Sequence, residues 1–316
     1  FRSPCTIEHA SANFFFEKYL PCFKSQTEGL IFLFTLLLST CISRLGNLGT
    51  DRPSFILAVI GRTGSYKTST VQATLNPYNN ENFSVCSFED TVASIVATLK
   101  QSRDMITIVD DFYTNTDREI TAKLEKIIRL NGDKSSVAKK MSGKKIVSES
   151  SDTITVVTGE QIPKVRFSSI PRMFIIDFQE AVNLQALTEL QASQAEFRGA
   201  LADFIQYTLD DFCIKLRQKF LDHRDSIMHH EAPKWHARYT SMCCWFLAIY
   251  DMFCEYCTTK NISFTNISDF PSNIRHYIAE QSKRYLENDS IFIFFKTLKS
   301  LCGENKLHTI NTSKIT

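Results

Sequence analysis

The chain has 316 residues, of which 43% are hydrophobic and 22% charged, and its formal net charge is +2. This length and apolar content allow a large buried interior and more than one core, so the composition excludes a chain without a folded core. The small net charge excludes general basicity as a means of binding a polyanion, so basic residues must be concentrated locally. The ten cysteines, without a secretory context, indicate reduced thiols.

Residues 1–50 are predicted to form a helical lead-in. The most apolar stretch of the chain lies there, with fifteen uncharged residues between Glu28 and Arg44. Because a helix needs roughly twenty apolar residues to span a bilayer, we expect a buried helix packed on the sheet and no membrane partner. The chain begins without methionine or a signal-peptide pattern, which suggests a segment of a larger, cytoplasmic protein.

Residues 61–68 are the most informative motif of the chain. The apolar run 55–60 precedes them, and a segment with helical character follows. A strand that ends in a glycine-containing loop lets successive backbone N–H groups surround phosphate oxygens, and the next helix turns its positive end toward them. The residues predicted to bind the nucleotide are Gly61, Arg62, Thr63, Gly64, Ser65, Tyr66, Lys67 and Thr68.

Two residues of this loop have specific expected roles. Lys67 is expected to reach the β- and γ-phosphates of ATP, and the Thr68 hydroxyl to hold Mg²⁺. The usual pattern has glycine before the lysine, whereas this chain has Tyr66. Position six lies at the start of the helix, so we expect a right-handed backbone there, which suits any residue. The alternative is an ordinary strand-to-helix turn of an α/β fold.

A helix is predicted over residues 87–100, with Ser87 and Asp90 at the spacing of a capping box. The apolar run 105–109 that follows is typical of a strand covered on both faces. It leads directly into Asp110 and Asp111. Asp110 is expected to hold Mg²⁺ through water from the side opposite the phosphates, and a surface aspartate pair that caps the next segment is the alternative.

Residues 129–147 contain six basic residues and one acidic residue, and we call them the basic segment. Its central part has the pattern of a hairpin that turns near Gly143. Lysines at the tip would contact the phosphates of nucleic acid without base specificity. These lysines are Lys139, Lys140, Lys144 and Lys145. The alternative is a solvated loop whose lysines serve solubility.

Two more strands are predicted, over 153–157 and 173–176. The first leads into Thr158 and is expected to lie between the phosphate-loop strand and the acidic strand, where a hydroxyl can reach the γ-phosphate or the attacking water. Arg172 stands beside a proline at the entrance to the second strand. It would point out of the subunit and act on a neighbour's nucleotide as an arginine finger, with Arg166 as the competing candidate. The alternative is a plain surface arginine.

From residue 181 onward the pattern is mostly helical. We therefore expect a core over residues 51–180, followed by a helical lid and C-terminal bundle over 181–316. Cys254 and Cys257 have metal-like spacing, but apolar residues recur around them at helical spacing. Helix cysteines are therefore favoured over a zinc site.

The phosphate loop 61–68, the acidic pair, the polar residues 158–160 and the segment 168–172 together resemble the helicase-type ATPases of the AAA+ group. The likeness covers about residues 50–180. It is nearest to superfamily 3 and MCM-like motors, and to the primase-associated helicase modules of phages, plasmids and chromosomal cassettes. The resemblance implies an α/β P-loop NTPase of the AAA+ type, with a parallel sheet flanked by helices and helical regions at both ends.

The resemblance also implies a function, namely that of an ATP-hydrolysing, Mg²⁺-dependent motor acting on DNA, single-stranded DNA above all. Such motors form homo-oligomeric rings such as hexamers, and the basic segment resembles the hairpin that they project into the central pore. Asp111 would polarise the attacking water, with Glu160 as the next candidate. We expect a replicative helicase module of a mobile element. The alternatives are an ATP-dependent switch or assembly scaffold with slow or no hydrolysis, and a small-molecule kinase.

Overall fold

The structure is a computed structural model that describes residues 13–49, 52–78, 85–113, 118–132, 151–162, 165–178, 182–230 and 235–287, together with positions 293, 297 and 300. Its strands are β1 (Ile56–Ile60), β2 (Val85–Ser87), β3 (Ile106–Phe112), β4 (Ile154–Gly159) and β5 (Met173–Asp177). Its α-helices are α1 (Gln26–Ser39), α2 (Ile42–Leu48), α3 (Lys67–Leu75), α4 (Val92–Gln101), α5 (Arg118–Gly132), α6 (Leu184–Ala192), α7 (Gln194–Tyr207), α8 (Phe212–His230), α9 (Ala237–Thr259) and α10 (Phe270–Glu287). The shorter helical turns are η2 (Phe15–Tyr19), η3 (Leu20–Cys22), η4 (Phe167–Arg172) and η5 (Thr265–Ile267).

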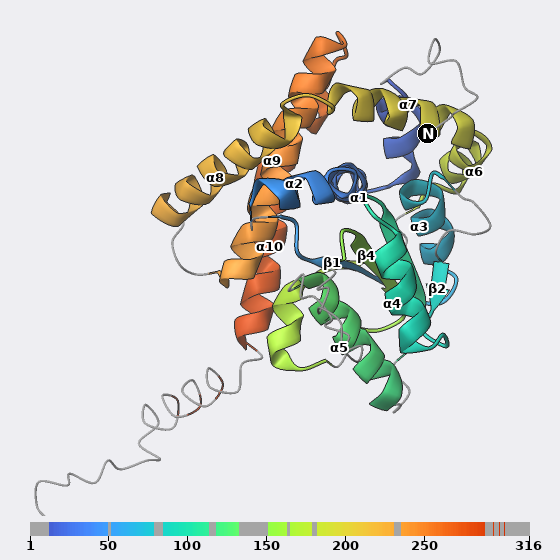
Figure 1. The fold of residues 1–316 in the computed structure, drawn as a ribbon, viewed down its shortest axis with the longest axis vertical. Helices are drawn as coiled ribbons and strands as arrows, with labels where there is room; N and C mark the ends of the chain where they lie inside the picture. The colour runs from blue at the N-terminus through green and yellow to red at the C-terminus, as the bar shows by residue number, and fades with distance from the viewer. Residues whose placement is uncertain are drawn as a thin grey trace, which may run out of the picture.

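The five strands form one sheet in the order β2-β3-β4-β1-β5, and every pair is parallel. Parallel neighbours need crossover connections, which helices supply here, so helices cover the sheet (Figure 1). β4 lies between β1 and β3, as the sequence predicts. The expected α/β fold with a parallel sheet flanked by helices is confirmed.

Alternate side chains of the strands enter two different cores. Leu57 and Val59 belong to the larger core, which includes residues of α1, α9 and α10, whereas Ile56 belongs to a smaller core with residues of α4 and α5. This period of two follows from the pleat of a strand, which points successive side chains to opposite faces. Figure 1 shows α4 and α5 together on one side of the sheet.

The apolar N-terminal stretch forms α1, in which eleven of fourteen residues are buried. Ser25 caps the helix by accepting the backbone N–H of Glu28, and α1 packs against α3, α9 and α10. The Phe32 ring lies 5.9 Å from the Phe178 ring at the end of β5. The prediction of a buried helix is confirmed. Within the described residues no single helix has the length and apolarity to cross a membrane. The helices α1 and α2 are together long and apolar enough, but the pair is bent by 60°.

The start of α4 differs from the prediction. Ser87 ends β2, and α4 begins at Val92, with Thr91 as the cap that accepts the N–H of Ser94. The Ser87 N–H instead donates to the carboxylate of Asp90 at 2.9 Å. Short polar side chains bond nearby backbone groups in turns as readily as at helix ends, so the capping-box spacing produces the turn before the helix.

The predicted domain boundaries at 50/51 and 180/181 stay a prediction. The larger core contains residues from Phe14 to Tyr285, so segments from both sides of the predicted central region contribute to it. Cys254 and Cys257 lie in α9, where Cys257 is buried and Cys254 half-buried, as expected of helix cysteines.

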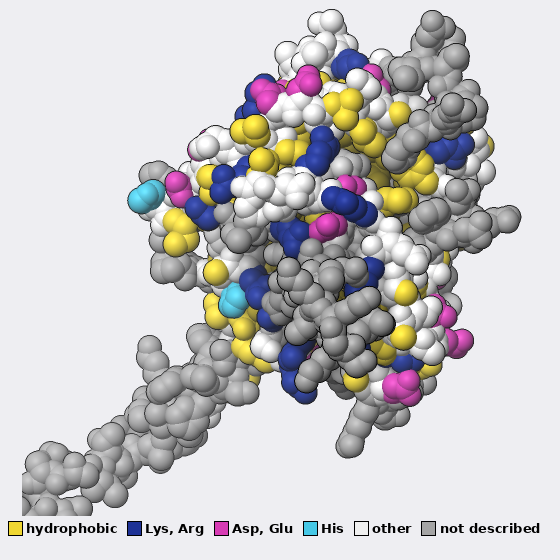
Figure 2. Space-filling view, in the orientation of Figure 1, with side chains coloured by type: hydrophobic (Ala, Val, Ile, Leu, Met, Phe, Trp, Pro, Cys, Tyr) yellow, Lys and Arg dark blue, Asp and Glu magenta, His cyan; other side chains and the backbone are white. Residues whose placement is uncertain are grey.

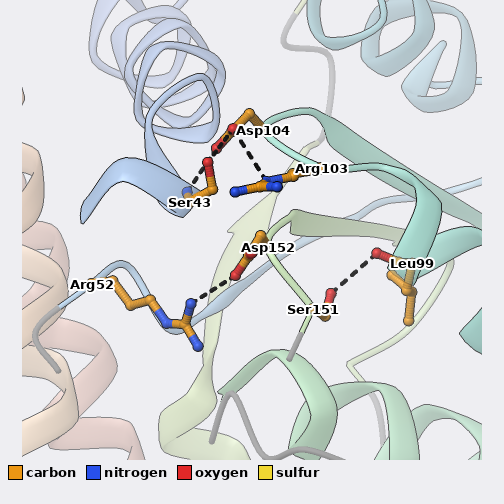
Figure 3. Close-up of polar contacts among 7 residues, drawn as sticks. All are labelled: Ser43, Arg52, Leu99, Arg103, Asp104, Ser151 and Asp152. Atoms are coloured by element: carbon orange, nitrogen blue, oxygen red, sulfur yellow. Dashed lines mark hydrogen bonds and ion pairs between the residues drawn. The ribbon is translucent and has the colours of Figure 1, made fainter. Parts of the chain in front are cut away.

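A polar network joins α2 to the segments that precede β3 and β4 (Figure 3). The Asp104 carboxylate accepts the backbone N–H of Ser43 at 2.7 Å, near the start of α2, and also the Ser43 hydroxyl. The Asp104 N–H donates to the Asp152 carbonyl, and the Asp152 carboxylate pairs with Arg52 at 2.7 Å. The network therefore fixes the edge of the sheet at which β3 and β4 begin.

Replacing Asp104 by alanine is expected to lower the free energy of unfolding by about 2 kcal/mol, because a backbone N–H of α2 and the Ser43 hydroxyl lose a charged acceptor. Urea unfolding measures this loss. The matched control is Arg103→Ala, since Arg103 is 65% exposed and lies 4.0 Å from Asp104. It should cost less than about 0.5 kcal/mol. Equal losses in the two variants would contradict the assigned role of Asp104.

Candidate nucleotide site

The phosphate-loop motif lies at the carboxyl end of β1, an inner strand between β4 and β5. The Gly61 N–H donates to the Gly159 carbonyl at 3.0 Å, and a Cβ on Gly61 would lie 2.2 Å from the carbonyl oxygen of Phe178. No side chain fits there. Gly64 has φ +81°, in the left-handed region that glycine adopts without strain. Close approach and backbone conformation thus explain both glycines of the motif.

Tyr66 corrects the prediction of a right-handed backbone at position six. Its φ of 61° and ψ of 22° are left-handed, because the chain turns there before α3 begins at Lys67. Its carbonyl accepts the N–H and the hydroxyl of Thr70, at 2.9 and 2.8 Å. The loop therefore keeps a conformation that suits glycine, although the residue is tyrosine.

The Lys67 ammonium lies against the loop, where it donates to the carbonyls of Gly61 at 2.6 Å and Arg62 at 2.9 Å. Partial burial lowers the pKa of this ammonium. The carboxylate of Glu160 acts most strongly in the opposite direction, followed by those of Asp110 and Asp111. A cation is thus held by the loop and close to carboxylates on β3 and after β4.

The acidic pair sits in an irregular part of β3. The pairing of β3 with β4 shifts register between Val109 and Phe112, and Asp111 has φ 66°. A bulge of this kind re-aims side chains. The Asp110 carboxylate accepts the Thr68 hydroxyl at 3.0 Å and also the Thr158 hydroxyl. The Asp111 N–H donates to the same Thr158 oxygen at 3.2 Å.

These groups surround one cavity of about 430 Å³ at the carboxyl edge of the sheet. The predicted site residues that line it are Thr63, Gly64, Tyr66, Lys67, Thr68, Asp110, Asp111 and Thr158. Ser69, Gly159 and Glu160 also line it. The only sequence signal for Ser69 is adjacency to predicted residues, whereas Gly159 lies in the segment 158–160 that contributes to the resemblance. Glu160 also accepts a hydrogen bond from the Thr63 hydroxyl, which ties the residues after β4 to the loop.

Other predicted residues lie apart from the cavity wall. Gly61 and Arg62 support Lys67 through their carbonyls, and the Ser65 hydroxyl is buried without a hydrogen-bond partner in the described part of the chain. The four lysines of the basic segment, Lys139, Lys140, Lys144 and Lys145, lie outside the described residues.

Arg172 lies at the opposite edge of the sheet. β5 pairs with β1 in parallel, with Met173 beside Ile56, so five residues of strand separate Arg172 from the loop. At about 3.3 Å per residue this is about 16 Å, farther than an arginine side chain reaches. Arg172 donates to the Ser168 carbonyl. Arg166, the competing candidate, pairs with Glu125 of α5 at 3.2 Å.

Basic side chains are visible on the face of the molecule drawn in Figure 2, where dark blue groups lie near the centre and at the lower edge of the described surface. Acidic side chains are interspersed with them on the same face. The small net charge of the chain is consistent with this mixture. The described surface on this face therefore does not form a uniformly positive track.

The oxygen atoms of Asp110 and its neighbours are suitable ligands for Mg²⁺. This ion takes one or two protein oxygen ligands and completes its shell with water and substrate phosphates. The Thr68 hydroxyl and the Asp110 carboxylate, 3.0 Å apart, supply such oxygens. Within the described residues no group of three or more His, Cys, Asp or Glu side chains could hold a metal ion. Mg²⁺ does not need such a group when a nucleotide provides ligands.

The sheet order and the structure of the loop define a P-loop-type fold. No family model and no curated protein matches the chain. Its fold is similar to a solved structure titled "SCCmec type IV Cch - active helicase", with a TM-score of 0.64 and 10% sequence identity. That match covers 93% of this chain and 54% of the other, so the chain spans about half the length of that structure.

Two weaker matches are the apo structure of the NrS-1 C-terminal region and JCV helicase with a bound small molecule. Their TM-scores are 0.37 and 0.33, both at 12% identity. The first covers 85% of this chain and 74% of the other, and the second 78% and 66%. Scores this low add nothing to the fold assignment.

Proposed function

We propose that this chain is an ATP-hydrolysing motor module of the AAA+ helicase type that acts on DNA. One observation carries the proposal: a single cavity is lined by Lys67 and Thr68 of the loop and by Asp110 and Thr158 of adjacent strands. A lysine that can bind phosphates, together with a hydroxyl and a carboxylate that can hold Mg²⁺, is what a nucleoside triphosphate site requires. The fold supports the proposal, because the structure with the TM-score of 0.64 is described as an active helicase.

In this proposal Lys67 binds the β- and γ-phosphates, and its hydrogen bonds with the loop carbonyls give way to phosphate oxygens. Thr68 and Asp110 would hold Mg²⁺, with Asp110 acting through water. The bound ion would neutralise charge that develops on the phosphates. Thr158 is oriented by Asp110 and by the Asp111 N–H, which suits a hydroxyl that senses the γ-phosphate or positions water.

The proposed water-activating carboxylate is that of Asp111. It lines the same cavity as Asp110, although successive side chains of a regular strand point to opposite faces, and the irregularity of β3 at these residues accounts for this. Glu160 is the second candidate, because its longer side chain lines the same cavity and already bonds to the loop at Thr63. Only one of them needs to accept a proton from the attacking water.

The proposal includes a homo-oligomeric ring. Arg172 lies about 16 Å from its own loop by the strand rise, so a role as an arginine finger would require a neighbouring subunit. An arginine that stabilises the transferred phosphoryl group from a second subunit makes hydrolysis depend on assembly. We further propose that the ring is a replicative helicase module of a mobile element, with the core over residues 51–180 and a helical lid over 181–316.

The basic segment provides the test of the DNA part of this proposal. Replacing Lys139, Lys140, Lys144 and Lys145 by alanine should weaken single-stranded DNA binding. The plot of log affinity against log salt should flatten by up to about 0.7 for each phosphate that is no longer neutralised. Basal ATP hydrolysis should persist, because the proposed hairpin would project away from the nucleotide and its charge would serve DNA binding and not the chemistry. Fluorescence anisotropy across a salt series measures the slope.

The matched control replaces four exposed lysines elsewhere by alanine, namely Lys24, Lys126, Lys215 and Lys283. This control carries the same change of net charge and should leave the salt slope closer to that of the unaltered protein. Equal slopes in both variants, with no stimulation of ATP hydrolysis by DNA, would contradict the motor and favour an ATP-dependent switch or scaffold.

A further inference from the structure

The cavity contains two non-glycine residues with left-handed backbone, Tyr66 with φ 61° and Asp111 with φ 66°. For a bulky residue this conformation is a true outlier, because the Cβ approaches the neighbouring carbonyl. Such strain persists mainly at functional sites, where surrounding structure enforces it. Glycine at position 66 would keep the loop conformation without the strain, so the tyrosine side chain must offer something that glycine does not.

The Tyr66 side chain has a position from which it can act on a ligand. It lines the cavity and is nevertheless 51% exposed, so it does not serve the core. Its phenol hydroxyl makes no hydrogen bond to any described residue, and the loop hydrogen bonds of Tyr66 involve its backbone. Lys67, Asp110 and Asp111, which would bind phosphate and metal, line the same cavity as Tyr66.

Several of the hydroxyl groups that line this cavity already donate hydrogen bonds to carboxylates of the protein, so they are less available to a ligand. The hydroxyls of Thr68 and Thr158 donate to Asp110, and the Thr63 hydroxyl donates to Glu160. The hydroxyls of Tyr66 and Ser69 make no hydrogen bond to any described residue, and that of Tyr66 stands on the longer side chain. The terminal phosphate of a nucleoside triphosphate carries three charged oxygens, which need donors as well as the lysine. A phenol hydroxyl without a competing partner would be such a donor, and a hydrogen bond to a charged oxygen is stronger than one between neutral groups.

We propose that Tyr66 is a specificity residue, whose hydroxyl donates a hydrogen bond to the terminal phosphate of the bound nucleoside triphosphate. The ring would cover this end of the cavity. The inference rests on the proposed function, because it requires a nucleotide in this cavity. A diphosphate lacks the terminal phosphate, so Tyr66 would raise the affinity for the triphosphate and leave that for the diphosphate unchanged.

The test compares Tyr66→Phe and Tyr66→Gly with the unaltered chain. Isothermal titration with Mg²⁺ would use ADP and the non-hydrolysable β,γ-imido analogue of ATP. Tyr66→Phe should bind the analogue about tenfold more weakly, the size expected when a hydrogen bond to a charged group is removed, and should bind ADP as before. Tyr66→Gly should lose at least as much affinity for the analogue. It should also melt about 2 °C higher, because the left-handed strain is relieved.

The matched control is Asn261→Gly, since Asn261 is exposed, has φ 57° and follows α9. This variant removes another left-handed side chain and should leave both nucleotide affinities unchanged. Two results would overturn the inference alone: an unchanged ratio of the two affinities in Tyr66→Phe, when binding still depends on Lys67, or a lower melting temperature of Tyr66→Gly. Failure of the unaltered protein to bind either nucleotide would overturn the proposed function, and this inference with it.

Discussion

Lys67→Ala is expected to reduce ATP hydrolysis by about 10³-fold or more and to weaken ATP binding strongly. The physical reason is that the developing charge on the γ-phosphate loses the cation that the loop holds against it. In the structure this cation is kept beside the loop by the carbonyls of Gly61 and Arg62, and Lys67 is the cationic side chain that lines the cavity among the described residues. Steady-state phosphate release and nucleotide titration measure the two effects.

The fold should survive this substitution, because the Lys67 ammonium bonds only to loop carbonyls and the residue belongs to neither core. Equal melting temperatures would verify this. Lys215→Ala is a control that removes an exposed lysine of α8, paired with Asp211 just before this helix, and it should keep the turnover of the unaltered protein. Near-normal turnover in Lys67→Ala would remove the phosphate-loop assignment and leave an ordinary strand-to-helix turn.

Arg172→Ala is expected to bind ATP normally and to hydrolyse it about 10³-fold more slowly, the effect of losing an arginine finger. Arg172 lies at the entrance to β5 and its own cavity at the opposite edge of the sheet, so the substitution should remove no contact with a nucleotide bound in the same chain. Mixing the Arg172→Ala and Lys67→Ala proteins should restore part of the activity. Each hybrid ring would then contain interfaces with an intact loop on one subunit and an intact arginine on the next.

Arg166→Ala is the matched control, because Arg166 is exposed and pairs with Glu125 of its own chain. It should change hydrolysis little and cost at most about 1 kcal/mol of stability. If Arg166→Ala instead shows the large loss and complements Lys67→Ala, the finger must be reassigned to it. Absence of complementation by either variant, with a monomeric mass in the presence of ATP, would favour the switch alternative.

Several parts of the fold could be predicted because their signals are local. The apolar runs before Gly61 and before Asp110 are strands that are buried on both faces, and continuous apolar sequence is what such strands require. The position of β4 between them was expected from the polar residues that follow its strand, and the structure agrees. The stretch that forms α1 could be read as a buried helix because it is too short to span a bilayer.

Other features could not be read from the sequence, because they depend on interactions between distant segments. The spacing of Ser87 and Asp90 fits a helix cap and a turn equally well, and the end of β2 decides between them. Nothing in the sequence showed that the Thr158 hydroxyl would join Asp110 and the Asp111 backbone. That interaction exists only because β3 and β4 are neighbours with a bulge at the aspartates.

The amino-acid sequence by itself determined the phosphate-loop motif, the acidic pair and the strands that carry them, since each depends on residues close together in the chain. The tertiary structure alone decided the backbone of Tyr66 and the distance of Arg172 from the cavity. The first was mispredicted because helix position was used as a guide, whereas the turn between β1 and α3 sets φ there. The second follows from strand pairing, because parallel register places the start of β5 and the end of β1 at opposite edges of the sheet.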